Sequence, residues 1–345
     1  MEPPSTAIPA NPIPARKSAA RVRRTRRTAA PELTGTGYLS VGAAMIFDMT
    51  QHTAIEISGP YDLREVALMG FGHRDERSFD GTMRMAFCLD GGYERAVGVA
   101  AQQQGDRLAL EVVTEDGPLT TEELDILRRQ VARVVSLDHD GVAFDRLCRA
   151  DPALAPVHAS APGFRPALFY SPYEAAVWSI ISARRARSQG IALRLRLAEQ
   201  AGTTFSVAGR PTLAVPTPSR LLQVESVPSL PADRIPRLHA VAEAARQGKL
   251  EADRLRALPP DAARAELQQL PGIGPFYSSL VLIRACGHAD LPAPEEPHSR
   301  AAIQAAYGLD HEPSADEVLR IAESWRPFRT WVTVLLRALA ERPAQ

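Results

Sequence analysis

The sequence has no net charge, because its 40 basic residues balance its 40 acidic residues over a length of 345. A protein without net charge does not attract nucleic acid over its whole surface, so any nucleic-acid interface must be local. The length is sufficient for two domains with substantial cores, because a chain of this size buries most of the surface that its unfolded form exposes.

Cysteine is scarce, and the chain contains only Cys88, Cys148 and Cys286. The three residues are far apart and form no C-x-x-C pair, which argues against a structural zinc site and against a disulfide framework. We therefore expect neither a metal ion nor another cofactor.

Long apolar runs are also missing. No run reaches the length of a transmembrane helix, and no apolar segment of the signal-peptide type follows the N-terminus. We expect a cytoplasmic protein with no membrane partner, and we expect it to be a monomer.

The first 34 residues combine prolines with basic side chains. Seven basic residues stand against Glu2 and Glu32, and few bulky apolar residues follow Ile13. Such a segment cannot bury a core, so residues 1–34 are predicted to be disordered. Two interpretations stay open: a nonspecific arm on DNA phosphates, and a solubilising tail or misassigned start codon. The basic residues are Arg16, Lys17, Arg21, Arg23, Arg24, Arg26 and Arg27.

Residues 35–140 have the pattern of a small α+β domain. Apolar and polar side chains alternate in four short segments, which predicts meandering antiparallel strands. Thr120 and Glu123 form a capping box, which predicts the start of an amphipathic helix. The Asp-His-Asp triplet at 138–140 has metal-ligating residue types, but a polar turn between helices explains it better. The predicted strands are 53–57, 82–87, 94–99 and 107–113.

Residues 141–345 have a helical pattern throughout, and we expect an all-α domain there. Ser171 and Glu174 form a capping box before a helix that is apolar nearly all round, which is typical of a buried central helix. The cations that follow this helix are either a solvated helix face or a set of phosphate contacts. They are Arg184, Arg185 and Arg187.

The stretch from Leu267 to Arg300 is the most informative part of the chain. A helix up to Leu270 is predicted, then a tight turn at 271–274, then a second helix that begins at Pro275. The glycines of the turn permit positive φ and a close approach of a partner to the backbone. We expect the amides of Gly272, Ile273 and Gly274 to be unpaired at the positive end of the second helix, where a DNA phosphate would fit. The alternative is an ordinary corner between two helices.

An acidic pair follows this turn and opens another helix. Glu296 lies 22 positions after Gly274 (296 − 274), and Glu295 precedes it. This arrangement resembles the helix-hairpin-helix DNA glycosylases, and it looks closest to those of the DNA-3-methyladenine glycosylase II type. The resemblance implies an α+β domain before an all-α glycosylase core, duplex DNA with damaged bases as the partner, and a place at the nucleoid. No cysteine follows Cys286, so the iron–sulfur loop of some members is absent.

The resemblance also implies roles for individual residues. Glu296 stands where the family has its catalytic Asp, and Glu295 is the neighbour that could serve instead. A carboxylate at this place stabilises the positive charge that develops on the sugar of a flipped-out nucleotide. Gly272, Ile273 and Gly274 would bind the phosphate backbone, and Arg184, with Arg185 and Arg187, stands where the family probes the duplex.

Phe276 occupies the position at which glycosylase-lyases of the superfamily carry a Schiff-base Lys. The resemblance therefore implies a monofunctional enzyme that uses water, although plain helix core also explains an apolar residue here. Leu280, Trp331 and Arg337 complete the implied base pocket. This pocket is less aromatic than an electron-poor alkylated base would favour, so another lesion is also possible.

Two main hypotheses follow from the sequence. The first is a monofunctional DNA glycosylase of base-excision repair that removes an alkylated base of the 3-methyladenine type. The second is a DNA-binding relative without catalysis, and an unrelated helical binding module is a third. A Glu296 carboxylate in a cleft beside Phe276 would favour the enzyme. A carboxylate that caps its own helix, or pairs with Arg300 at the surface, would favour the binding protein.

Overall fold

An antiparallel sheet forms the N-terminal part of the computed structural model, which describes residues 50–69, 78–340 and 342. The predicted basic arm at 1–34 lies outside these residues. The sheet has the strand order β1-β4-β3-β2, so β2, β3 and β4 form a meander and β1 adds to β4. Its strands are β1 (Thr50–Glu56), β2 (Met83–Cys88), β3 (Ala96–Gln104) and β4 (Arg107–Val113).

Two helices cover one face of the sheet, α1 (Leu63–Leu68) and α2 (Thr121–Val134). The period-two pattern turns Met85, Val99 and Leu110 towards these helices, and these three side chains are fully buried. The predicted capping box is present at the start of α2, where the side chains of Thr120 and Glu123 each accept a hydrogen bond from the other's backbone N–H. The α+β prediction for this region is confirmed.

The remainder of the chain is mostly helical, as predicted. Helix α5 is buried along its whole length and starts at the N-cap Ser171. The helices are α3 (Gly141–Ala150), α4 (Leu154–Ala159), α5 (Pro172–Ser182), α6 (Arg187–Ala201), α7 (Pro218–Leu221), α8 (Ile235–Arg246), α9 (Ala252–Ala257), α10 (Pro260–Leu267), α11 (Pro275–Arg284), α12 (Pro297–Tyr307), α13 (Ala315–Ala322) and α14 (Arg329–Ala340).

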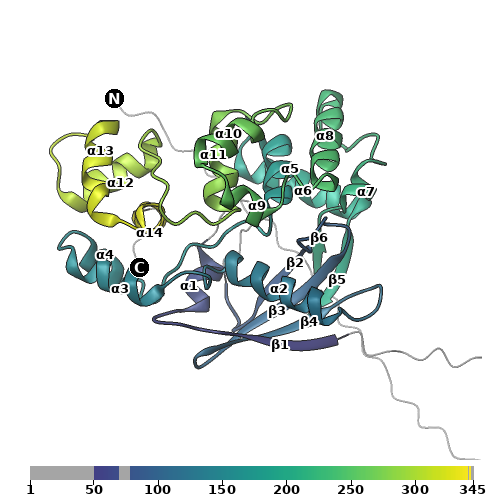
Figure 1. Cartoon of the computed structure of the whole chain (residues 1–345), viewed down its shortest axis with the longest axis horizontal. Coiled ribbons are helices and arrows are strands. Elements are labelled where there is room, and N and C mark those ends of the chain that lie inside the picture. The colour runs from purple at the N-terminus through teal and green to yellow at the C-terminus, as the bar shows by residue number, and fades with distance from the viewer. Residues whose placement is uncertain (1–49, 70–77, 341, 343–345) are drawn as a thin grey trace, which may run out of the picture. The chain divides into compact units, whose positions relative to one another are not determined.

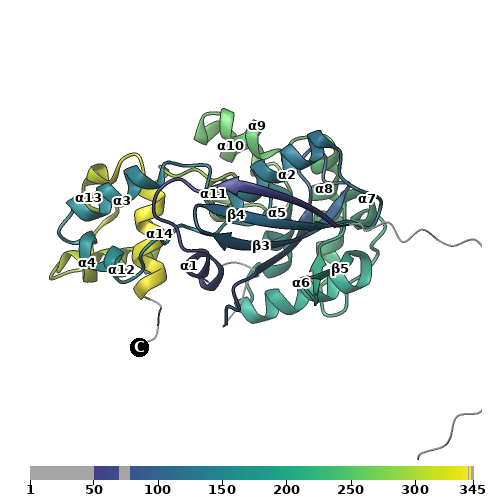
Figure 2. The same ribbon diagram turned by 90° about the horizontal axis from the view of Figure 1, so that it is seen from below.

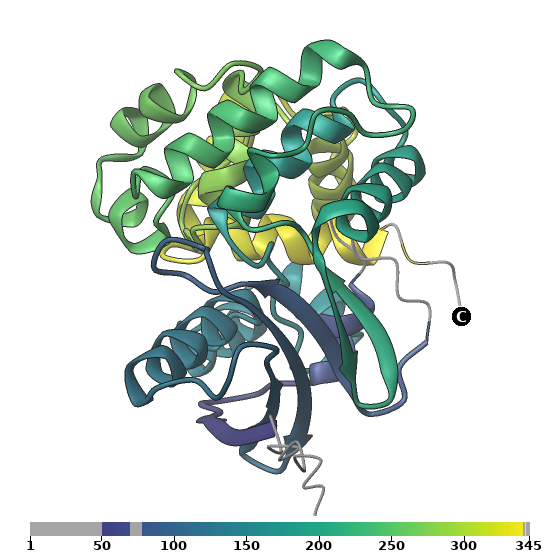
Figure 3. The same ribbon diagram turned by 90° about the vertical axis from the view of Figure 1, so that its right-hand side faces the viewer.

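The expectation of an all-α region from 141 to 345 is wrong at one place, a β-hairpin of β5 (Thr203–Val207) and β6 (Arg210–Ala214). Its first strand alternates buried and exposed residues and is rich in β-branched side chains, a pattern typical of a strand. The β-hairpin lies along the other face of the sheet (Figure 3), where Phe205 packs on β3. A Cβ on Gly98 of β3 would lie 2.7 Å from the Cβ of Phe205, so this close approach requires glycine.

The helices form two lobes, each with its own apolar core. The first lobe comprises α5 to α11, and the second comprises α3, α4 and α12 to α14. Figure 1 and Figure 2 both show the two lobes side by side, with the segment 285–296 leading from α11 to α12. A site that uses α11 and α12 therefore draws its residues from both lobes.

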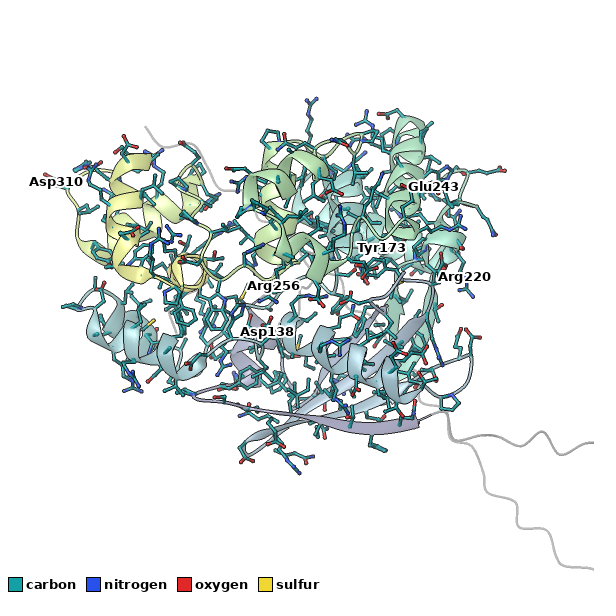
Figure 4. The ribbon with its side chains drawn as sticks, in the orientation of Figure 1. Asp138, Tyr173, Arg220, Glu243, Arg256 and Asp310 are labelled. Atoms are coloured by element: carbon teal, nitrogen blue, oxygen red, sulfur yellow. The ribbon has the colours of Figure 1, made fainter. Side chains whose placement is uncertain are left out.

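The triplet at 138–140 is a polar turn between α2 and α3. Asp140 caps the N-terminus of α3. Asp138 Oδ2 lies 2.7 Å from Nη1 of Arg256 on α9, and Figure 4 labels these two neighbouring side chains. His139 Nε2 lies 2.9 Å from the carbonyl oxygen of Gly287. Among the described residues, no helix is both long and apolar enough to cross a membrane.

Candidate functional site

The predicted helix–turn–helix unit is present, with α10 and α11 joined by residues 268–274. Gly272 has φ +94°, which favours glycine, as predicted. Gly274 is the N-cap of α11 and has φ −92°, so this position does not use the positive φ that glycine permits. Pro275 occupies the first turn of α11, where its missing N–H leaves no hydrogen bond unmade.

The amides of the turn are only partly available to a ligand. The N–H of Ile273 donates to the carbonyl of Leu270 at 3.0 Å, and its side chain is buried, so the expectation of a free Ile273 amide is wrong. Within the described part of the chain, the N–H groups of Gly272, Gly274 and Phe276 have no partner. A Cβ on Gly274 would meet no atom within 4 Å, so the space before these amides is open. Unpaired amides at a helix N-terminus form a binding site for an anion.

The turn rests on the first lobe. The Gln268 amide donates to Ser278 Oγ at 3.0 Å, and this hydroxyl donates to the carbonyl of Pro275 at 3.0 Å. A Cβ on Gly272 would lie 2.9 Å from Cδ1 of Ile180, so the C-terminal half of α5 supports the turn directly. The cations that follow α5 are thereby brought to the neighbourhood of the turn.

Arg184 has a strained backbone, with φ +59° at the junction between α5 and α6. This left-handed conformation costs a non-glycine residue roughly 1–2 kcal/mol. Arg184 is exposed, and within residues 50–69 and 78–340 neither Arg184 nor Arg185 makes an ion pair. Arg187 is exposed at the start of α6. A strained residue that presents an unpaired cation is typical of a functional site.

Glu296 is the N-cap of α12. The Oε2 atom of Glu296 accepts two hydrogen bonds from Ser299, one from the backbone N–H at 2.7 Å and one from the side-chain hydroxyl at 2.5 Å. Its Oε1 lies 3.4 Å from the N–H of His298 and 3.6 Å from Nη1 of Arg337 on α14. Burial acts to raise the pKa of Glu296, but the Ser299 hydrogen bond, the Arg337 charge and the helix amides together lower it. The carboxylate is therefore held as an anion.

The environment of Glu296 bears on the two hypotheses. The carboxylate caps its own helix, which favours the binding protein. It pairs with Arg337 and not with Arg300, whose guanidinium faces Glu312 at 3.2 Å. Three pronounced cavities among the described residues lie elsewhere, and neither Glu296 nor Phe276 lines any of the three. Glu295 is exposed beside the cap.

The residues predicted for a base pocket are distributed over both lobes. Phe276 is 65% exposed on the first turn of α11, and Leu280 is half-buried on the same helix. Arg337 is on α14 of the second lobe, where its Nη1 lies 3.6 Å from Glu296 Oε1. Trp331 is 2% exposed and packs edge-on against Phe144, so its position in the core does not fit stacking on a base.

The sequence interpretation missed Ser299, which donates two hydrogen bonds to Glu296. A signal for it exists. The spacing Glu-x-x-Ser from 296 to 299 places an acceptor at the N-cap and a hydroxyl donor at the third helical position, although the reciprocal bond of a capping box is not formed, because the Glu296 N–H donates to the carbonyl of Ala293.

Solved structures share this fold. The chain is similar to the 3-methyladenine DNA-glycosylase from Archaeoglobus fulgidus, with a TM-score of 0.66, 22% identity, and coverage of 83% of this chain and 97% of that chain. It is also similar to MBOgg1 in complex with a low-affinity DNA ligand, with a TM-score of 0.62, 18% identity, and coverage of 84% and 98%.

A third similar structure is the 8-oxoguanine glycosylase/lyase of Clostridium acetobutylicum in complex with double-stranded DNA containing cytosine opposite 8-oxoguanine. The TM-score is 0.60 and the identity 18%, with coverage of 86% of this chain and 98% of that chain. No protein-family model and no curated protein matches the sequence. The chain thus has the fold of the helix-hairpin-helix DNA glycosylases, as the sequence predicted.

Proposed function

We propose that the protein is a monofunctional DNA glycosylase of base-excision repair, which hydrolyses the N-glycosidic bond of a flipped-out damaged base in duplex DNA. The observation that carries the proposal is the Glu296 carboxylate, held as an anion at the start of α12 in a chain with a glycosylase fold. The cap engages mainly Oε2, whereas Oε1 has only longer contacts. The cap therefore leaves one oxygen available to a sugar.

The helix hairpin would bind the duplex. Gly272 and Gly274 offer unpaired amides to one phosphate, and the start of α11 adds its positive dipole. Arg184 and Arg185, which follow the α5 helix that supports the turn, would contact the neighbouring backbone. This local cationic surface supports duplex DNA as the partner of a chain without net charge. A partner of this kind would place the protein inside the cell, at the nucleoid.

The chemistry would be electrostatic. A base must leave the helical stack before it can be cut, which costs a few kcal/mol. Cleavage of the glycosidic bond then builds positive charge on the sugar, which the Glu296 anion would stabilise while it orients the attacking water. Phe276 occupies the place of the lyase Lys and offers no amine, so water is the nucleophile. Leu280 and Phe276 would provide the apolar side of the base site.

The lesion is the variable part of this proposal. The resemblance indicates an alkylated base of the 3-methyladenine type, whereas one of the similar structures is an 8-oxoguanine glycosylase/lyase. A base-release assay on duplexes with defined lesions tests the function. We expect a free base, an intact strand until alkali is added, and no protein–DNA adduct with borohydride.

Two results would contradict the proposal. A borohydride-trapped adduct would show an amine nucleophile and lyase chemistry. Tight duplex binding without release of any base would favour the second hypothesis, a non-catalytic DNA-binding relative, which the helix cap on Glu296 supports.

The hairpin makes a separate prediction. Gly274→Leu should weaken binding to all duplex sequences alike, by roughly tenfold, because hydrogen bonds to a charged phosphate contribute about 1.5–3 kcal/mol. The salt dependence of binding should become shallower. The Cβ of the added side chain meets no atom within 4 Å in the folded protein, and φ at this position is ordinary, so the fold should tolerate the substitution.

Fluorescence anisotropy over a series of salt concentrations measures both quantities. Thr121→Leu is the control, since it places the same leucine side chain at the exposed start of another helix, α2. Equal duplex affinity of Gly274→Leu and the wild type would remove the turn from the interface.

A further inference from the structure

The two oxygens of Glu296 have different partners. Oε2 is held by the hydroxyl and the amide of Ser299, both on its own helix. Oε1 accepts only a long hydrogen bond from the His298 N–H, at 3.4 Å, and faces the guanidinium of Arg337, which comes from α14 and lies 3.6 Å away. The Glu296 side chain is 19% exposed and that of Arg337 is 42% exposed, so the ion pair lies at the protein surface and not in the core. Oε1 is thus the oxygen that can turn towards a ligand, and a cation stands beside it.

The proposed reaction fixes where the base must lie. The sugar carbon C1′ has to approach the Glu296 carboxylate, and the base is attached to C1′ by a single bond. A base cleaved at this site therefore lies within a few ångströms of the Arg337 guanidinium. This group is always charged, and it offers five N–H donors in a rigid fork and no acceptor.

We propose that Arg337 determines specificity by charge: it favours a neutral damaged purine that carries an additional carbonyl oxygen, and it disfavours a cationic alkylated base. This inference rests on the proposed glycosylase function and names the substrate class of the same site. Oxidised and deaminated purines have the required chemistry.

The ion pair explains how the selection works. A carbonyl oxygen accepts a hydrogen bond from the guanidinium and draws it away from Oε1, which leaves the Glu296 charge free to stabilise the sugar cation. A cationic base repels the guanidinium and keeps it on Oε1. A carboxylate that stays paired stabilises a second cation less, because the two positive charges compete for one negative charge.

A comparison of Arg337→Gln with the wild type tests the inference. Single-turnover base release is measured on two duplexes, one with neutral 8-oxoguanine and one with cationic 7-methylguanine, after subtraction of uncatalysed release. The ratio of the 8-oxoguanine rate to the 7-methylguanine rate should fall by about tenfold in Arg337→Gln. Two like charges about 5 Å apart at an effective dielectric of 20 repel by roughly two- to three-hundredfold in rate, and the exposure of Arg337 reduces this to the tenfold expected.

Arg337→Lys and Arg320→Gln complete the series. Lysine keeps the charge without the fork, so it should keep the discrimination against 7-methylguanine and lose part of the 8-oxoguanine rate. Arg320 is 70% exposed on α13, and its replacement should change neither rate. Equal losses on both lesions in Arg337→Gln would show that the ion pair only anchors α12 to α14 and would overturn the inference.

Failure of the proposed function would give a different result. If the wild type released neither base, the glycosylase proposal would fall. The selectivity of Arg337 would then be measured as the ratio of the dissociation constants of the 8-oxoguanine and 7-methylguanine duplexes. A binding ratio that shifts in Arg337→Gln and not in Arg320→Gln still supports charge selection, and an unchanged binding ratio overturns it.

Discussion

Glu296→Gln should lose base release by roughly 10²–10³-fold, the range found when a charge-stabilising group is removed from a water-poor site. Glutamine has nearly the same size and can still accept hydrogen bonds from Ser299, but it carries no negative charge. The loss should appear in the single-turnover rate. Duplex binding should survive or tighten, because a partly buried carboxylate near phosphates repels them.

Glu295→Gln is the matched control for this substitution. Glu295 is the adjacent exposed carboxylate, and neighbouring residues at a helix start point in different directions, so its loss should change the rate much less. Full activity in Glu296→Gln would show that the assigned mechanism is wrong. Loss in Glu295→Gln alone would place the catalytic carboxylate one residue earlier. A melting curve separates catalysis from the helix cap, whose weakening costs about 1 kcal/mol.

Arg133→Met should destabilise the fold by about 3–5 kcal/mol, the cost of leaving a buried charge without its partner. Arg133 of α2 is 3% exposed and lies 2.7 Å from Asp90 Oδ2. It also donates to the carbonyl oxygens of Tyr170 and Ala285. Ala285 is the C-cap of α11, so Arg133 joins the end of the hairpin helix to the helix that covers the sheet.

Urea denaturation of the wild type, Arg133→Met and Arg129→Met measures this contribution. Arg129 is exposed on the same helix, and its replacement should change the free energy of unfolding by less than about 0.5 kcal/mol. Combining Arg133→Met with Asp90→Asn should recover part of the loss, because the unpaired charge is then removed. Equal stability of Arg133→Met and Arg129→Met would contradict the account of this contact.

The local features of the site could be predicted from the sequence. Gly272, Pro275 and the acidic start of α12 act through backbone preferences that extend over a few residues. Gly274 shows the limit of such reasoning. Its φ is ordinary, and its lack of a side chain leaves the space before the amides open, which only the surrounding structure reveals.

Pairings between distant elements could not be predicted in this way. Arg337 meets Glu296 because α14 packs against α12, and no local pattern encodes that contact. Trp331 shares a helix face with core residues, and only the packing of Phe144 against it shows that it is buried. The strand β5 was missed because its short alternating pattern lies within a long helical region, where it gains its stability from the sheet beneath it.

The central claim is that Glu296 supplies a negative charge to a developing sugar cation. The most direct measurement compares binding to two duplexes, one with a cationic pyrrolidine in place of the abasic sugar and one with neutral tetrahydrofuran. We predict that the wild type prefers the cationic duplex by at least about a hundredfold at fixed salt, and that Glu296→Gln loses this preference. Equal affinity of the wild type for the two duplexes, or a preference that persists in Glu296→Gln, would contradict the account.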